Sequence, residues 1–164
     1  MTRTADQLKT ILLQEIDGFI TAVEKAEEIR SSIFRHDWKR LSQNLERMEH
    51  ATGYIAALEK ERSHVFSTLR REVGEKSAAG FYTVIVHLDT GRQEELSKLF
   101  RQLKSLVLQL QGSIWSIDAY TRTLSTTIYD ILQEMFPHRR GTMYSKTGRK
   151  QKHGSDPLVV NRQL

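Results

Sequence analysis

The segment from Leu96 to Phe136 carries apolar residues in rows spaced seven apart, which is the spacing of one helix face. This pattern predicts one helix of about 46 residues that Pro137 ends. Two neighbouring rows form a continuous stripe, so we expect the stripe to be the core face of the helix. The first row is Leu96, Leu103, Leu110, Ile117, Leu124 and Ile131, and the second is Phe100, Val107, Ile114, Thr121, Ile128 and Met135.

A third row begins five residues after the first and points about 140° away from it. Its members are Arg101, Leu108, Trp115, Arg122, Tyr129 and Phe136. A core on one side of the helix leaves this outer row unburied, so the row needs a second partner. That partner is either another part of this chain, such as the segment 81–86, a second copy of the chain, or another protein.

Two further helices are predicted upstream, over 4–34 and 38–73, with Asp37 as the N-cap of the second and Gly74 as its stop. Short connections make neighbouring helices antiparallel. Between Gly74 and Gly91, the run 81–86 is β-branched and aromatic, but a lone strand has no partner, so we expect a short helix or an extended plug. Asp89 or Thr90 then caps the third helix. The buried stripes comprise Leu12, Ile16, Phe19, Val23, Ala26 and Ile33 in the first helix, and Leu41, Leu45, Met48, Ile55, Leu58, Phe66, Leu69 and Val73 in the second.

The predicted fold is therefore all-α: an elongated antiparallel three-helix bundle with long coiled-coil-like helices. The bundle domain covers residues 1–137, and a basic flexible tail covers 138–164. The tail holds seven Lys or Arg residues against one acid and has a net charge of +6, whereas the remainder has 18 basic and 19 acidic residues and a net charge of −1. The sequence pI near 9.6 thus describes the tail and does not support a nucleic-acid-binding face on the body.

Other features narrow the functional class. The chain has no cysteine, which excludes disulfides and a thiolate nucleophile. We find no signal-peptide pattern at the amino terminus and no apolar run of the roughly 18 residues needed to span a bilayer, so we expect a cytoplasmic protein without a transmembrane segment. His50 and His64 are about four turns apart on one predicted helix, too far to share a metal. We therefore expect no enzyme, metal or cofactor.

The tail carries a family-specific arrangement. It contains Tyr144, three small or basic residues and Gly148, then a basic stretch and a short apolar end at 158–160. Together with the long third helix ended by Pro137, this arrangement resembles the FlgN family of flagellar export chaperones. The resemblance covers the whole chain in architecture, but its motif is confined to about twenty residues. The family often places asparagines in the middle of the third helix, where this chain has Gln109, Gln111, Ser113 and Ser116.

The resemblance implies a cytoplasmic, non-enzymatic chaperone of type III export. Such a protein binds hook-filament junction (hook-associated) proteins through their terminal amphipathic helices, prevents premature polymerisation and delivers them to the export gate. By this pattern, Tyr144 and Gly148 contact the cytosolic domain of the export gate. The expected client-binding residues are Leu108, Trp115, Tyr129, Leu132 and Phe136.

Two alternatives remain open from the sequence. One is a homo-oligomeric coiled-coil scaffold or adaptor, such as a homodimer, in which the outer row is the oligomer interface. The other is a nucleic-acid or anionic-membrane binder that acts through the tail. The tail has one aromatic residue, Tyr144, and no run of stacking residues, so we expect no sequence-specific nucleic-acid recognition.

Overall fold

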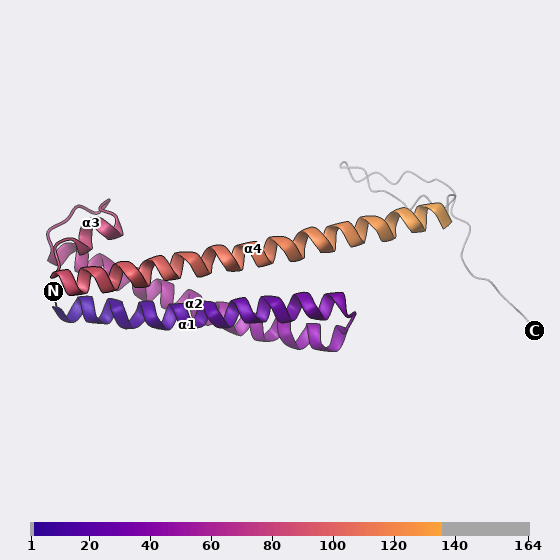
Figure 1. Cartoon of the computed structure of the whole chain (residues 1–164), viewed down its shortest axis with the longest axis horizontal. Helices are drawn as coiled ribbons and strands as arrows, with labels where there is room; N and C mark the ends of the chain where they lie inside the picture. Colours follow the sequence, from indigo (N-terminus) through magenta and orange to yellow (C-terminus); the bar gives the residue numbers. More distant parts are fainter. Residues whose placement is uncertain (1, 136–164) are drawn as a thin grey trace, which may run out of the picture. The chain divides into compact units, whose positions relative to one another are not determined.

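The computed structural model describes residues 2–135 and is helical throughout its regular structure, with no strand among these residues. Four helices follow in order: α1 (Thr2–Phe34), α2 (Trp38–Glu72), α3 (Phe81–Ile85) and α4 (Thr90–Met135) (Figure 1). The prediction of an all-α helical bundle is confirmed. Contacts divide the chain into two units, residues 1–117 and 118–164. The predicted domain boundary at 137 lies outside the described residues.

The α1–α2 hairpin forms because local signals reverse the chain between Phe34 and Trp38. His36 adopts a φ of 55°, and the amide of Asp37 donates to the carbonyl of Ser32 at 3.0 Å. The Asp37 carboxylate then accepts the amide of Arg40 at 3.0 Å, which confirms the predicted N-cap. Behind this turn, the side-chain nitrogen Nδ2 of Asn44 donates to the Ser32 hydroxyl at 3.3 Å. This hydrogen bond joins the two helices.

Replacing Asp37 by alanine is expected to destabilise the protein by about 1 kcal/mol, because the first turn of α2 loses its capping acceptor. Asp37→Asn keeps an acceptor oxygen at this position and should stay within a few tenths of a kcal/mol of the parent. Urea unfolding followed by circular dichroism measures both changes. Equal losses in the two variants would show that the carboxylate charge, and not capping, stabilises the turn.

At its other end α2 stops where the sequence predicts. Val73 is the C-cap, and Gly74 has a φ of +76°, a conformation that glycine adopts without strain. The amide of Glu75 donates to the carbonyl of Arg70 at 3.0 Å, which closes the last turn of the helix.

Residues 81–85 of the segment 81–86 form the short helix α3, which is one of the two predicted possibilities. Val84 and Ile85 of α3 are completely or almost completely buried in the core. The Phe81 ring stacks on Phe100 with centroids 3.9 Å apart and lies 5.7 Å from Phe66. Burial against α2 and α4 thus overrides the β preference of this run.

The first part of α4 runs parallel to α1. Asp89 accepts the amide of Arg92 at 3.1 Å and so caps α4 as predicted. Arg92 also pairs with Asp6 at 3.2 Å, and Lys9 pairs with Glu95 at 2.6 Å. Because both partners advance by three residues between these two ion pairs, the two helices run in the same direction, and α2 is antiparallel to α1.

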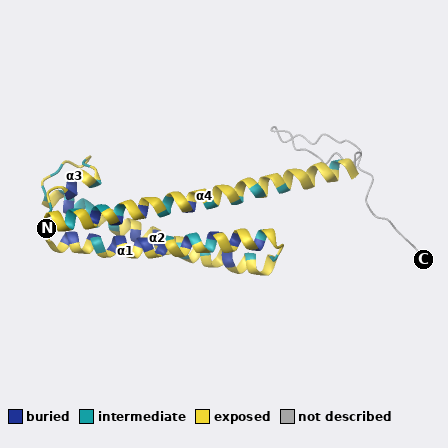
Figure 2. Cartoon of the chain, in the orientation of Figure 1, coloured by how far each residue is buried: buried dark blue, intermediate teal, exposed yellow. Residues whose placement is uncertain are grey.

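The core of the unit 1–117 is drawn from all four helices, as the dark residues in Figure 2 show. All predicted stripe residues of α1 are buried or half-buried. In α2 the prediction is wrong for Leu45, which is 51% exposed; at this level the preceding residue, Asn44, is the one that is buried and bonds to Ser32 of α1. The buried apolar cluster consists of Ala5, Leu8, Leu12, Ile16, Leu69, Val84, Ile85, Leu96, Leu99 and Leu103, and a second cluster consists of Ala22, Ala26, Ile55 and Leu110.

One charge is buried with this core. Glu15 is 1% exposed, and the Arg62 Nε lies 3.0 Å from its Oε1 and 2.7 Å from its Oε2. Burial raises the pKa of the Glu15 carboxyl above its ordinary value, and the hydrogen bond and charge of Arg62 oppose that rise. None of the helices in the described part of the chain is long and apolar enough to cross a membrane.

Candidate functional site

The first candidate surface lies on α4 within the unit 1–117. Leu108 is 68% exposed and Trp115 is 70% exposed. Segment 81–86 does not cover them, because its Phe81 and Tyr82 rings contact Phe100, a residue of the second row. The possibility that the outer row packs against this segment is therefore wrong for the two residues.

The last two turns of α4, in the unit 118–164, form a second candidate surface. Five of the eight residues from 128 to 135 are large and apolar, and each is about half exposed or more. At 100° per residue they span roughly 160° of the helix circumference, with Thr127, Asp130 and Glu134 on the opposite side. We call this set the terminal apolar arc: Ile128, Tyr129, Ile131, Leu132 and Met135.

The terminal apolar arc includes residues that the sequence assigns to the core. In the first two rows, Leu96, Leu103 and Leu110 are buried, but beyond Leu110 no described residue of α4 is buried. The expectation of a core face along the whole helix is therefore wrong for five residues of the two rows, whereas Ile117 and Leu124 are half-buried. The five exposed residues are Ile114, Thr121, Ile128, Ile131 and Met135. The physical reason is that a seven-residue repeat shows which residues share a face, whereas burial requires a partner packed on that face.

The predicted client-binding residues thus divide into two groups. Leu108, Trp115, Tyr129 and Leu132 are exposed side chains of α4. Phe136, like the predicted gate-binding residues Tyr144 and Gly148, lies outside the described residues. Sequence reasoning missed Ile128, Ile131 and Met135 as surface residues. The signal that could have found them is the difference between the predicted helix lengths, about 46 residues against 31 and 36.

The surroundings of the terminal apolar arc carry few charges. Asp118 and Arg122 pair with each other at 2.9 Å across one turn of α4. Asp130 and Glu134 have no ion pair with another described residue. The arc is therefore a wide apolar surface with acids on the far side of the helix, which suits a partner with an apolar face.

Two charged groups of the unit 1–117 have shifted pKa values that their ion-pair partners help to set. Glu15 pairs with Arg62 between α1 and α2, and Asp89 has its pKa lowered mainly by hydrogen bonds from Arg92. Within the described range, no group of three His, Cys, Asp or Glu residues is placed to hold a metal ion. What the described surfaces offer chemically is apolar contact area.

The chain matches no family model, and comparisons with curated proteins and with solved structures gave no match either.

Proposed function

We propose that this protein is a helical chaperone that binds apolar helical segments of client proteins on the terminal apolar arc of α4. Leu108 and Trp115 form a second exposed apolar pair on α4, which we propose as a separate client contact. The observation that carries the proposal is the density of exposed apolar side chains from 128 to 135. Five such side chains expose on the order of 500 Å², at the upper end of what monomers leave uncovered.

The shape of the surface favours a helical client. An amphipathic helix presents an apolar stripe of about 100°, which can pack along an apolar helix face of similar or greater width. The terminal apolar arc is wider than one such stripe, and Tyr129 provides an aromatic anchor of the type that dominates binding energy.

The finer proposal follows the resemblance of the tail to FlgN proteins. The clients are hook-filament junction proteins, which the chaperone keeps unpolymerised in the cytoplasm, and Tyr144 with Gly148 contacts the export gate. The exposed α4 residues are compatible with this division, since the client site and the gate site occupy different parts of the chain. A purified junction protein should bind, whereas an unrelated protein with a terminal amphipathic helix should bind more weakly. Equal binding of both would support a chaperone without the flagellar assignment.

The double substitution Trp115→Ser/Tyr129→Ser is expected to weaken client binding at least about 100-fold, because two exposed aromatic anchors are lost. Helical content by circular dichroism should stay unchanged, since both side chains lie at the surface. The matched control is Trp38→Ser/Tyr54→Ser, which removes the same residue types from exposed positions of α2, 62% and 51% exposed. The proposal fails if the control variant loses client binding to the same extent.

The substitution of Tyr129 also distinguishes the client-binding chaperone from a homo-oligomeric scaffold. Ile128, Ile131 and Met135 follow the three-and-four spacing of a coiled-coil seam, so a second copy could also cover them. Sedimentation velocity over a range of protein concentrations measures this association. A stable dimer that Tyr129→Ser dissociates, combined with no affinity for junction proteins, would favour the scaffold.

A further inference from the structure

We propose that the tip of the α1–α2 hairpin is a docking surface for an anionic lipid bilayer. The tip surface consists of Arg35, Trp38, Lys39, Arg40 and Arg47. It belongs to different helices and residues from the client surface, so the proposal is independent of the proposed function.

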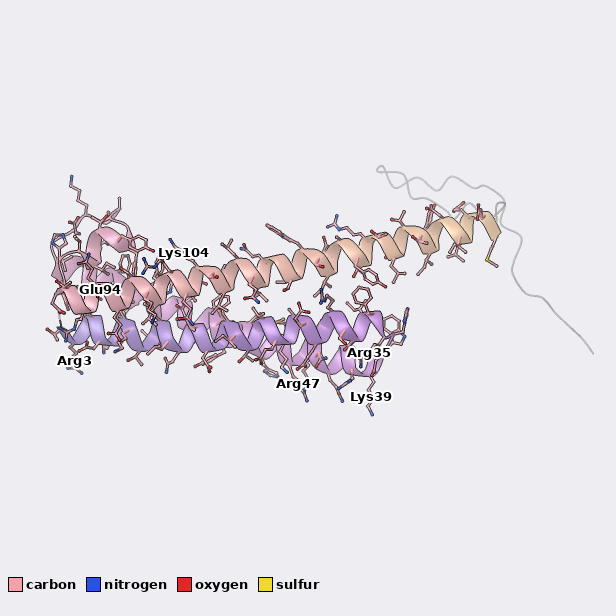
Figure 3. The ribbon with its side chains drawn as sticks, in the orientation of Figure 1. Arg3, Arg35, Lys39, Arg47, Glu94 and Lys104 are labelled. Atoms are coloured by element: carbon pink, nitrogen blue, oxygen red, sulfur yellow. The ribbon has the colours of Figure 1, made fainter. Side chains whose placement is uncertain are left out.

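Exposed cations gather at this end of the hairpin. Figure 3 labels Arg35 and Lys39 at the tip and Arg47 farther back along α2. None of the four cations of the tip surface forms an ion pair with an acid in residues 2–135, whereas the neighbouring Arg30 is paired with Glu27 at 2.8 Å. The four cations are therefore not held in ion pairs within the described residues.

The acids nearby reduce this charge without cancelling it. Asp37 is half-buried, and its carboxylate accepts the Arg40 amide at 3.0 Å, so it is directed toward the start of α2. Glu46 is exposed and precedes Arg47. Between 35 and 47 the sequence thus holds four cations and two acids.

An exposed tryptophan lies among these cations. Trp38 is 62% exposed, and the ring of His36 meets it edge-on with centroids 6.0 Å apart. Leu45 follows two turns later and is also exposed. Tryptophan is the side chain most enriched at membrane interfaces, and Lys and Arg extend their charges to headgroups while their stems cover apolar surface.

The geometry favours a flat anionic surface over an acidic peptide. The tip is the end of a helix hairpin, with a chain reversal of only three residues between α1 and α2. Such an end is convex, whereas peptide sites are grooves or sheet edges that contact a peptide along its length. The Asn44 bond to Ser32 joins the two helices behind the tip, so Trp38 and the cations stand on a fixed base.

The experiment uses the full chain with Trp115→Phe, which leaves Trp38 as its single tryptophan. Vesicles of phosphatidylcholine with about one third phosphatidylglycerol provide the anionic surface, and pure phosphatidylcholine provides the neutral control. Trp38 emission should shift to the blue and be quenched by brominated acyl chains in the anionic vesicles only. About 0.5 M salt should reverse both effects, since it screens exposed charges.

The basic tail could bind the same vesicles, and the fluorescence separates the two modes. The matched variant Trp38→Phe reports from Trp115, whose emission should stay unquenched. Lys39→Ser/Arg40→Ser should weaken the Trp38 response about tenfold or more, because each cation near an anionic surface strengthens binding about fivefold. Lys39→Arg/Arg40→Lys should retain it.

Three results would overturn the proposal. If the protein binds the vesicles but the wavelength of Trp38 emission does not change, the membrane affinity belongs to the tail. A Trp38 shift with poly-glutamate but not with anionic vesicles would assign the tip to an acidic polypeptide. Equal quenching in neutral and anionic vesicles would show that the four cations have no role.

Discussion

Arg62→Met is expected to lower the free energy of unfolding by about 3 kcal/mol at pH 7, because it leaves the buried Glu15 carboxylate without its cationic partner. The Arg62 guanidinium lies 2.7 Å from Glu15 Oε2, and Glu15 is 1% exposed. Besides Arg62, the charge of Glu59 acts on the Glu15 carboxyl and raises its pKa. Urea unfolding followed by circular dichroism measures the loss.

The pH dependence of this loss identifies its cause. Burial raises the pKa of Glu15 in the folded state above its ordinary value of 4.5, so the folded protein takes up this proton at a higher pH than the unfolded chain. The stabilising contribution of protonated Glu15 is complete below the unfolded pKa and is lost as the pH rises through the folded pKa. The loss of unfolding free energy that Arg62→Met causes should therefore become smaller as the pH falls from 7 toward the ordinary pKa of glutamate.

Two controls accompany the Arg62 variant. Glu15→Leu/Arg62→Met removes both charges and should recover most of the stability, since an apolar pair of similar volume often replaces a buried ion pair at little cost. The free energy of unfolding of Glu15→Gln should rise relative to that of the parent protein as the pH rises from about 4 to 7, because the variant never carries the buried charge. A deficit of Arg62→Met that is independent of pH would show that lost packing of the arginine stem causes it.

Leu103→Ala is expected to lower the free energy of unfolding by about 3 kcal/mol, whereas Ile131→Ala should lower it by less than about 1 kcal/mol. The two residues belong to one row of α4 and are 28 positions apart. Leu103 is 5% exposed within the core cluster, and Ile131 is 48% exposed in the terminal apolar arc. Thermal and urea unfolding of both variants measure the difference.

The two α4 substitutions also separate stability from binding. Ile131→Ala should weaken client affinity and leave the fold intact. Leu103→Ala should lower the free energy of unfolding without removing a residue of the client surface. A loss of about 3 kcal/mol from Ile131→Ala would mean that another surface buries the end of α4 in solution. A second copy of the chain would then be the first candidate, and sedimentation velocity would detect it.

Most helix ends could be predicted from the sequence because the signals that set them are local. Asp37 and Asp89 accept amides of the following turns, and Gly74 adopts the positive φ that ends α2. These groups act within four residues of their own position. The bounds of α1, α2 and α4 therefore agree with the predicted ones to within about two residues.

The candidate site was predictable only in part. The outer row identified Leu108, Trp115, Tyr129 and Leu132 as surface residues with no obvious partner. The same periodicity assigned Ile128, Ile131 and Met135 to the core, because a repeat of seven shows which residues share a face and not whether anything packs on that face. Their exposure depends on whether another part of the chain packs on them, and the periodicity does not contain that information.

The sequence by itself determined that this chain is helical, where most of its helices begin and end, and which residues share a face, because these properties depend on contacts between near neighbours. The tertiary structure decided what covers each face. It made segment 81–85 helical by burying Val84 and Ile85, and it paired Glu15 with an arginine 47 residues away. It also ended the core of α4 at Leu110, since burial depends on partners distant in the chain.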